Sequence, residues 1–216
     1  TVAFGGRTMD KNNKVKYYNT PETRIFKKGD NLFGFDLAKE EITNQGFAIL
    51  LEGYFDVVTL HQHGIKNGVA SLGTSLTTNQ AILLKNVTNN IVITYDGDEA
   101  GKENAFRSAS VLKSVGCNVL IAYVENELDP DEYVKKYGSK KFIGEVILKA
   151  KDTKEAFIGY KKNQHDLSCA KDRFLYVDTV LRELSSNDVH EQEKLLKMLG
   201  DTLNVSLDNI YNAIKS

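Results

Sequence analysis

The sequence contains little of what would cross-link it, bind zinc or span a membrane. Only two cysteines occur in 216 residues, Cys117 and Cys169, and they lie far apart with neither a CxxC pair nor a pair of histidines nearby. The sequence therefore predicts neither a disulfide framework nor a zinc site, and we expect both cysteines to be buried thiols. No apolar run approaches the roughly 18 residues of a membrane-spanning helix, and no signal peptide precedes the first motif. We therefore expect a soluble protein with a cytoplasmic location.

Proline is scarce as well, with two residues in the chain, so no proline-rich linker separates its parts. Hydrophobic residues make up 41% and charged residues 26%, a composition that suits one large domain or two small ones. The net charge is only −1, but residues 1–30 contain seven Lys or Arg against three Asp or Glu, a local charge of +4. Such a segment suits either a surface that binds a polyanion or a solvated loop. Because the chain starts at Thr1, inside what reads as a strand (TVAFGG), we expect a piece of a longer protein.

Apolar runs of strand length alternate with amphipathic stretches of helix length in the middle of the chain. Continuous runs of Val, Ile and Leu are typical of parallel strands that are covered on both faces. We therefore predict an α/β domain, in which helices lie on both faces of a parallel sheet. Thr77 and Gln80 have the spacing of a capping box at the start of one helix. The predicted strands are 47–51, 67–71, 91–95 and 118–124, and the predicted helices are 54–63, 76–86, 99–115 and 129–138.

The carboxy-terminal part of the sequence predicts a different architecture. From about Asp152 the strand pattern ends and four helical stretches follow, which indicates an all-α helical bundle. The last two stretches also have the rhythm of a DNA-reading helix-turn-helix, but the final helix carries almost no Arg, Lys or Gln suited to base edges. Ordinary bundle packing is the preferred interpretation. The predicted helices are 153–163, 168–185, 188–203 and 206–215.

Acidic residues gather where the predicted strands end. The carboxyl ends of parallel strands meet at one edge of a sheet, so side chains that follow different strands lie close together there. Six carboxylates with no basic partner nearby in the sequence would repel one another, and a divalent cation is the natural compensation. Ligation by oxygen alone favours Mg²⁺ or Mn²⁺. The six acids are Glu52, Asp56, Asp96, Asp98, Asp129 and Asp131.

Simpler interpretations remain open for these acids. A DxD after a strand is often a turn, and Asp98 could serve only as the cap of the helix that begins near Glu99. A calcium-binding loop is excluded because Ala100 and Arg107 occupy positions that need ligands. A HAD-type phosphatase would use the first aspartate of DxD as a nucleophile, but it would need neither Glu52 nor the later aspartates.

Several motifs together resemble those of bacterial DnaG-type primases, in the same order and with similar gaps. Four of them are similar to the TOPRIM motifs of that family: EGYFDV (52–57), ASLGTSLT (70–77), YDGDEAG (95–101) and DPDEYV (129–134). Three more resemble the primase segment before that domain: FGGR (4–7), KYYNTPET (16–23) and FKKG (26–29). The resemblance covers residues 1 to about 145, and the helical tail resembles the end of the primase polymerase domain more loosely.

The resemblance implies three parts with distinct roles. Residues 1–45 would be the last part of a basic, β-rich template-binding subdomain, residues 46–150 a TOPRIM-like catalytic domain, and residues 151–216 the helical bundle. The implied reaction is the synthesis of short RNA primers on single-stranded DNA by two-metal nucleotidyl transfer. The TOPRIM nucleases share this metal chemistry, so cleavage of a phosphodiester stays open as an alternative. A non-catalytic single-strand-binding module is the other alternative, although the intact set of six acids argues against it.

The resemblance also assigns residues and partners. Glu52, Asp96 and Asp98 would be catalytic, with Glu52 as ligand or general base, and two Mg²⁺ or Mn²⁺ ions would be held by these three together with Asp56, Asp129 and Asp131. The implied template-binding residues are Arg7, Lys16, Tyr17, Asn19 and Lys28. The loop SLGTS could offer backbone N–H groups of Gly73, Thr74 and Ser75 to a triphosphate, or be a plain tight turn.

The partners implied are a single-stranded DNA template, ribonucleoside triphosphates and, through a domain absent from this chain, the replicative helicase. The family's zinc domain is absent too, so we expect no zinc. We expect a monomeric fragment with no membrane partner, from a protein that works at the bacterial replication fork.

Overall fold

The computed structural model describes residues 1–8, 17–72, 75–124, 128–183, 189–206 and 208–210. The chain divides into two compact units, Thr1–Ala150 and Lys151–Ser216. Each unit has its own hydrophobic core. The predicted fold class is confirmed, because the first unit contains a parallel sheet flanked by helices and the second is helical.

The sheet of the first unit places its most apolar strands at the centre. Within this unit the strand order is β4-β3-β5-β6, and every neighbouring pair is parallel. All four residues of β3 are buried, which accounts for the unbroken apolar run in the sequence. The strands are β3 (Ala48–Leu51), β4 (Gly68–Ala70), β5 (Asn90–Ile93) and β6 (Asn118–Ile121). All four predicted strands are confirmed, although β5 starts one residue early and β6 ends three residues early.

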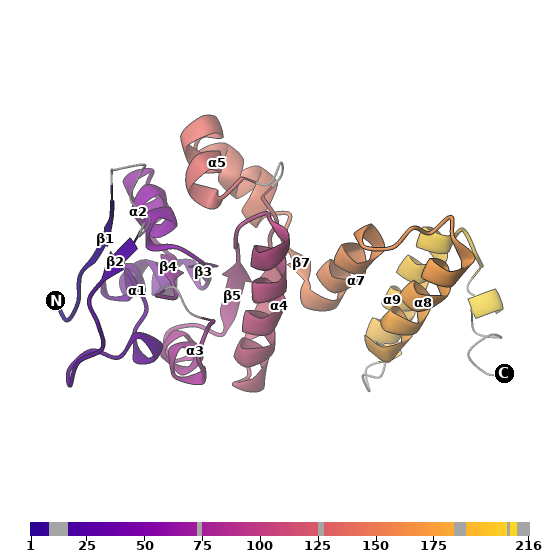
Figure 1. Cartoon of the computed structure of the whole chain (residues 1–216), viewed down its shortest axis with the longest axis horizontal. Coiled ribbons are helices and arrows are strands. Elements are labelled where there is room, and N and C mark those ends of the chain that lie inside the picture. The colour runs from indigo at the N-terminus through magenta and orange to yellow at the C-terminus, as the bar shows by residue number, and fades with distance from the viewer. Residues whose placement is uncertain (9–16, 73–74, 125–127, 184–188, 207, 211–216) are drawn as a thin grey trace. The chain divides into compact units, whose positions relative to one another are not determined.

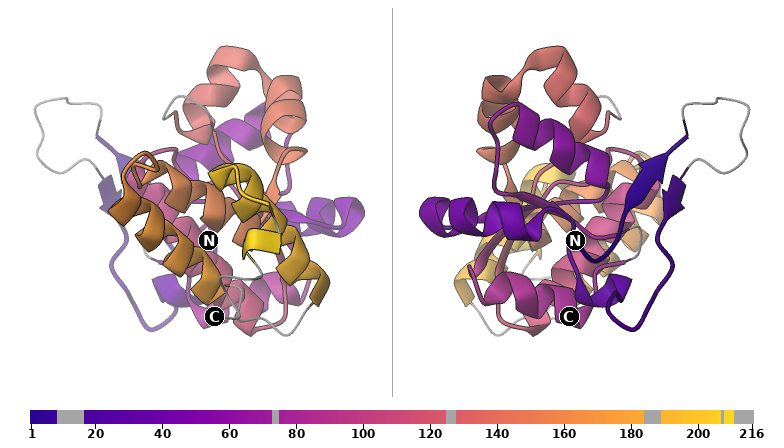
Figure 2. Two further views of the ribbon diagram at one scale, coloured as in Figure 1. Left: turned by 90° about the vertical axis from the view of Figure 1, so that its right-hand side faces the viewer. Right: turned by 90° about the vertical axis from the view of Figure 1, so that its left-hand side faces the viewer.

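Helices flank this sheet and bury its apolar side chains. On one face, Ile49 and Leu51 of β3 belong to a core cluster with Val57 and Leu60 of α2. Helices α2 and α5, which Figure 1 labels, pack against each other, and Figure 2 shows the same unit from two further sides. Helix α4 packs against β6 and also contacts α3. The predicted helices correspond to α2 (Tyr54–Gln62), α3 (Thr78–Lys85), α4 (Glu99–Ser114) and α5 (Pro130–Tyr137). Helix α6 (Ser139–Phe142) and the π-helical turn η3 (Ile143–Ile147) were not predicted.

The capping box predicted at the start of α3 is present, and it does more than begin the helix. Thr77 accepts the Gln80 backbone N–H at 3.2 Å, and the Gln80 side chain accepts the Thr77 N–H at 3.0 Å. The Gln80 amide, which is fully buried, also donates to the carbonyls of Lys28 at 3.0 Å and Asn31 at 2.7 Å. One side chain therefore fixes the basic segment to α3.

The basic segment contains less strand than the sequence indicated. The prediction of a strand at the very start is wrong, because residues 1–4 are not strand and β1 comprises Gly5–Arg7. It pairs antiparallel with β2 (Tyr17–Asn19), and a 3-10 turn, η1 (Lys28–Asp30), follows. Helix α1 (Phe35–Gln45) was not predicted at all.

The second unit begins with the two-residue strand β7 (Lys151–Asp152) and continues as α7 (Thr153–Asn163), α8 (Ala170–Glu183) and α9 (Val189–Leu203). Three of the four predicted helices are thus confirmed, and most of the fourth falls outside the described residues. Their core includes Tyr176, Val180 and Leu199. The expectation for Cys169 is wrong, because this residue is exposed in the turn before α8, whereas Cys117 is buried as expected. No helix in the described part of the chain is long and apolar enough to cross a membrane.

Candidate active site

The segment after β5 is shaped by a helix cap and a close backbone approach. Asp98 is the N-cap of α4, and its Oδ1 accepts the Gly101 N–H at 2.7 Å. Glycine is needed at 101 because a Cβ there would lie 2.3 Å from the Asp96 carbonyl oxygen. The structure therefore confirms that Asp98 caps α4. It uses one carboxylate oxygen and leaves the other for a second interaction.

Asp129 repeats this arrangement at the end of the next strand. It is the N-cap of α5, and its Oδ1 accepts the Glu132 N–H at 2.6 Å. Because β5 and β6 are neighbours in the sheet, Asp98 and Asp129 follow adjacent strand ends, and each occupies a helix N-terminus. The partial positive charge of a helix N-terminus favours a carboxylate at such a position. Capping and function are thus compatible for both residues.

Asp56 lies deep between these elements. Its side chain is 5% exposed and accepts the backbone N–H groups of Gly53 and Asp131, each at 3.1 Å. Burial is the main cause that raises the pKa of Asp56 to about 7, and the charges of Asp96 and Asp129 raise it further against those two hydrogen bonds. The raised pKa indicates that a negative charge on Asp56 is poorly compensated in the metal-free protein.

Burial raises the pKa values of Asp96 and Glu52 as well. Burial, followed by the charges of Glu52 and Asp129, raises the pKa of Asp96 to about 7. The Oδ1 atom of Asp96 is buried and has no hydrogen-bond partner among the described residues. Burial also raises the pKa of Glu52, while the Asn104 amide, which donates to Glu52 Oε1 at 3.2 Å, opposes that rise. The acids therefore repel one another across this edge of the sheet.

Asp131 has a basic partner close to it in the sequence. We expected all six acids to lack a basic partner nearby in the sequence, and this is wrong for Asp131. Lys135, one helical turn later, places its Nζ 2.6 Å from Asp131 Oδ1. The Thr59 hydroxyl of α2 donates to the same oxygen. The spacing of four residues between Asp131 and Lys135 was a signal for this ion pair.

The oxygen atoms of these acids are the kind of ligand that a hard divalent cation prefers. The carboxylates carry uncompensated negative charge, and Asp96 Oδ1 is a buried acceptor that has no donor among the described residues. Within the described part of the chain, however, no group of three or more His, Cys, Asp or Glu side chains is gathered closely enough to hold an ion. Binding would therefore require these carboxylates to turn toward a common point.

The basic segment lies beside this acidic edge. Arg7 of β1 lies with its guanidinium carbon 5.9 Å from the ring centroid of Phe55, and the Tyr54 hydroxyl donates to the Gly6 carbonyl at 3.0 Å. Tyr54 and Phe55 begin α2, directly after Glu52 and Gly53. The first turn of α2 thus joins the predicted template-binding strand to the acids.

The other predicted binding residues are only partly placed. Tyr17 is opposite Arg7 in the β1–β2 pair, and Asn19 is opposite Gly5. Lys28 is in η1, and Ser75 is exposed. Lys16, Gly73 and Thr74 lie outside the described residues.

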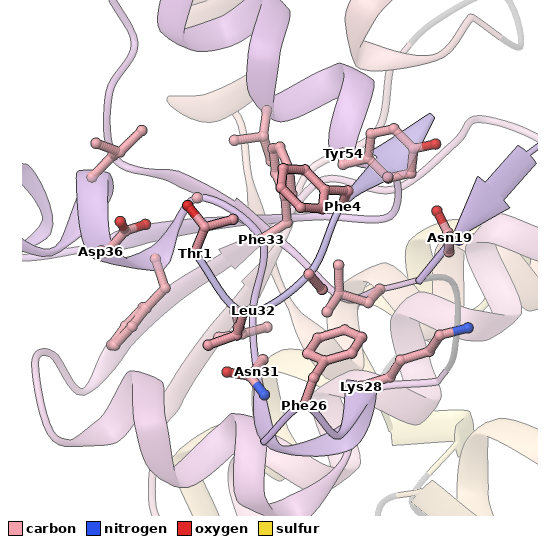
Figure 3. Close-up of a pocket in the computed structure, with 18 of the residues that line it drawn as sticks. Thr1, Phe4, Asn19, Phe26, Lys28, Asn31, Leu32, Phe33, Asp36 and Tyr54 are labelled. Carbon is pink, nitrogen blue, oxygen red and sulfur yellow. The ribbon is translucent and has the colours of Figure 1, made fainter. Parts of the chain in front are cut away.

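A hollow of about 730 Å³ opens next to the basic segment (Figure 3). The aromatic rings of Phe4, Phe26 and Phe33 line it, together with Asn19 and Lys28 from the predicted template-binding set. None of the six acids, all of which are in the described part of the chain, is among its lining residues. The hollow is therefore separate from the carboxylate cluster.

Sequence reasoning missed two side chains that contact the acids. Asn104 is on α4 and binds Glu52, from which it is 52 residues away in sequence. Thr59 is on α2 and binds Asp131, at a separation of 72 residues. Neither contact had a local signal, because both depend on how helices pack across the sheet.

Comparisons with known proteins match the chain to two family models and to a curated relative. Residues 49–134 match the family described as Toprim-like, and residues 1–39 match the N-terminal domain of the DNA primase catalytic core. The chain is 39% identical to the DNA primase of Halalkalibacterium halodurans over 208 residues, which is 96% of this chain and 35% of that protein. It thus spans about a third of the length of that relative.

Solved structures show the same likeness. A structure of the DnaG catalytic core is 32% identical, with a TM-score of 0.71, over 96% of this chain and 68% of that one. A structure of the DnaG primase catalytic domain bound to ssDNA is also 32% identical, with a TM-score of 0.74, over 96% of this chain and 66% of that one.

Proposed function

The chain belongs to the family of DnaG-type DNA primases, and from this premise we propose that it carries the catalytic part of an enzyme that makes short RNA primers on single-stranded DNA. The observation that carries the proposal is the set of acids at the strand ends, which includes Asp96 with its buried, unpartnered Oδ1, joined through the first turn of α2 to β1 and its Arg7. Burial and mutual repulsion raise the pKa values of Asp56 and Asp96, in agreement with this arrangement. Basic groups that grip a polyanion next to acids that lack a counter-charge suit a metal-dependent reaction on a nucleic acid.

The acids would have two roles, metal ligation and proton acceptance. Asp96, Asp98 and Asp129 would hold Mg²⁺ or Mn²⁺, two ions in all, with Glu52 as a ligand or as the general base. Such ions, when bound, supply the activation of a primer 3′-hydroxyl and neutralise the triphosphate. Glu52 is held by Asn104 at the end of β3, and burial raises its pKa, which makes its carboxylate a better proton acceptor than that of an exposed glutamate. Asp56, which is buried beside these acids, would add negative charge to the site.

The basic segment would position the template. Arg7, Lys16 and Lys28 would contact phosphates, which give affinity without sequence preference. Tyr17 would offer a ring for base stacking, and Asn19 would offer a polar side chain. The loop of Gly73, Thr74 and Ser75 would offer backbone N–H groups to the incoming triphosphate.

Other properties belong to the whole protein and are proposed on the strength of the family. Ribonucleoside triphosphates would be the substrates, and the replicative helicase would be contacted by parts of the protein outside this chain. The enzyme would act as a monomer in the bacterial cytoplasm, at the replication fork. A nuclease or a pure clamp is less well supported, because the named relatives are primases.

The test uses an Asp98→Asn variant, because asparagine is as good an N-cap as aspartate and so removes the charge without removing the cap of α4. Asp201→Asn, which changes an exposed acid of α9, is the matched control. Each protein is assayed for ribonucleotide addition on single-stranded DNA with Mg²⁺ or Mn²⁺, and for DNA binding by gel shift.

We expect Asp98→Asn to abolish synthesis while DNA binding stays within about threefold of the wild type, because the acids serve chemistry and the basic segment serves binding. The control should retain both activities. For the wild type, cleavage of the DNA in place of synthesis would establish a nuclease, and binding with neither reaction would establish a clamp. Either result would refute the proposal.

A further inference from the structure

Asp131 is tied into the packing of two helices. Its side chain is 16% exposed. One of its oxygens accepts a hydrogen bond from the hydroxyl of Thr59, a residue of α2 that is 4% exposed. Lys135, on the same helix as Asp131, forms an ion pair with the carboxylate. A carboxylate engaged by a buried hydroxyl and an ammonium group has little capacity left for a metal ion.

The backbone of Asp131 makes a second contact with α2. Its N–H donates to Asp56 Oδ1 at 3.1 Å, and the other oxygen of Asp56 holds the Gly53 N–H. Polar contacts thus run in both directions between α2 and α5: Thr59 donates to Asp131, and Asp131 donates to Asp56. Because these groups are largely shielded from water, each would be costly to leave unpaired. We call Thr59, Asp56 and Asp131 the α2–α5 latch.

The latch bears directly on Asp129. Asp129 is two residues before Asp131, and it caps the helix that the latch holds. Asp129 follows β6, and Asp96 follows the neighbouring strand β5, so both aspartates follow adjacent strand ends at one edge of the sheet. Any shift of the first turn of α5 along α2 would move Asp129 relative to the acid at the end of β5.

We propose that Asp131 and Thr59 are positioning residues that lock α5 onto α2 and thereby place Asp129, and that Asp131 is not itself a metal ligand. This inference rests on the proposed metal site. It assigns different roles to the two aspartates of the DPD motif: Asp129 faces the ion, and Asp131 holds the helix. It also assigns a role to Thr59, which sequence analysis did not single out.

The test compares Thr59→Val with Thr59→Ser in the full chain. Valine keeps the branched shape and removes the donor, whereas serine keeps the donor. Two measurements are made: Mn²⁺ affinity by calorimetry, and, without metal, the hydrogen-exchange rate of the Asp131 amide by NMR. Thr59→Val should weaken Mn²⁺ binding by about tenfold, the usual effect of losing a residue that orients a ligand, and should speed the exchange. Thr59→Ser should stay within about twofold of the wild type in both.

A double-mutant cycle separates a latch from a ligand. Asp131→Asn keeps an oxygen for Thr59 to bind, so its loss of Mn²⁺ affinity should be no larger than that of Thr59→Val, and the double variant should be no weaker than the weaker single variant. Additive losses, or a loss for Asp131→Asn as large as for Asp129→Asn, would show that Asp131 is a ligand and overturn the inference. Unchanged exchange in Thr59→Val would also overturn it. If the wild type binds no Mn²⁺, the proposed metal site is wrong, and the exchange measurement still decides the latch.

Discussion

Asp56 and Asp96 each have a folded-state pKa of about 7, raised from an ordinary value of 3.8 mainly by burial. Between these two pH values the folded protein binds more protons than the unfolded chain, so its stability falls as pH rises through that window. We expect the metal-free protein to melt a few degrees lower at pH 8 than at pH 5. Thermal scans monitored by circular dichroism, in buffers of equal ionic strength, measure this difference.

The Asp96→Asn variant is the control for this pH effect. Because asparagine carries no charge, the variant should be more stable than the wild type at pH 8 without metal and should show a smaller pH dependence. It should also lose much of the stabilisation that Mn²⁺ gives to the wild type. A variant that is less stable at pH 8, with an unchanged gain from Mn²⁺, would make Asp96 a structural turn residue.

Gly101 allows α4 to pass close to the acidic turn after β5. A Cβ at this position would lie 2.3 Å from the Asp96 carbonyl oxygen, so Gly101→Ala must displace either α4 or the acidic turn. We expect a loss of about 1–3 kcal/mol in the free energy of unfolding, measured by urea titration, together with weaker Mn²⁺ binding. Gly159→Ala is the matched control within α7, because no atom would lie within 4 Å of its Cβ. That change should stabilise the protein by about 0.5–1 kcal/mol. Equal effects of the two substitutions would contradict the close approach.

At the scale of elements, the basic segment is held in place by α3 through Gln80 and by the first turn of α2 through Tyr54. We therefore expect a preformed binding surface whose lysines contact phosphates. Replacing Lys16 and Lys28 by Ala should weaken single-stranded DNA binding uniformly across sequences. It should also reduce the salt dependence of log K by about 1.4, at roughly 0.7 for each lost contact.

The measurement is a fluorescence titration at several salt concentrations on two unrelated DNA sequences. Lys171→Ala and Lys197→Ala together, which change exposed lysines of α8 and α9, form the matched control. An unchanged slope in the Lys16 and Lys28 variant would mean that the +4 segment is a solvated loop.

Some helices and strands could be predicted from the sequence, and others could not. Strands β3 and β5 and helix α2 could be predicted because their signals are local: apolar runs, a spacing or a turn glycine. Helix α1 was missed because its N-cap is Gly34, which has no side chain to cap the helix, so no capping signal marks where the helix begins.

The same distinction applies to the candidate site. The acids were found because parallel strand ends meet at one edge, which is a rule of topology. The contacts of Asn104 with Glu52 and of Thr59 with Asp131 could not be found from sequence, because helix packing brings together residues that are 52 and 72 positions apart. Cys169 was placed wrongly because its burial was inferred from residue type alone, whereas it lies in an exposed turn.

At the scale of the whole molecule, the two units have separate cores. All six acids and the described template-binding residues belong to the first unit. We therefore expect a chain that ends at Ala150 to fold and to keep the response to Mn²⁺. At an ion concentration of about 100 times the dissociation constant, binding adds roughly 2.7 kcal/mol to the stability, so melting should rise by a few degrees.

The measurement is a pair of thermal scans, with and without Mn²⁺, on the shortened chain and on the full chain. Residues 151–216 alone serve as the control: they should fold as helix and show no response to the ion, because none of the six acids is among them. Mg²⁺ should act in the same sense as Mn²⁺, since carboxylate oxygens bind both ions. If the shortened chain folds but no longer responds to Mn²⁺, the helical unit contributes to the metal site, and the assignment of that site to the first unit is wrong.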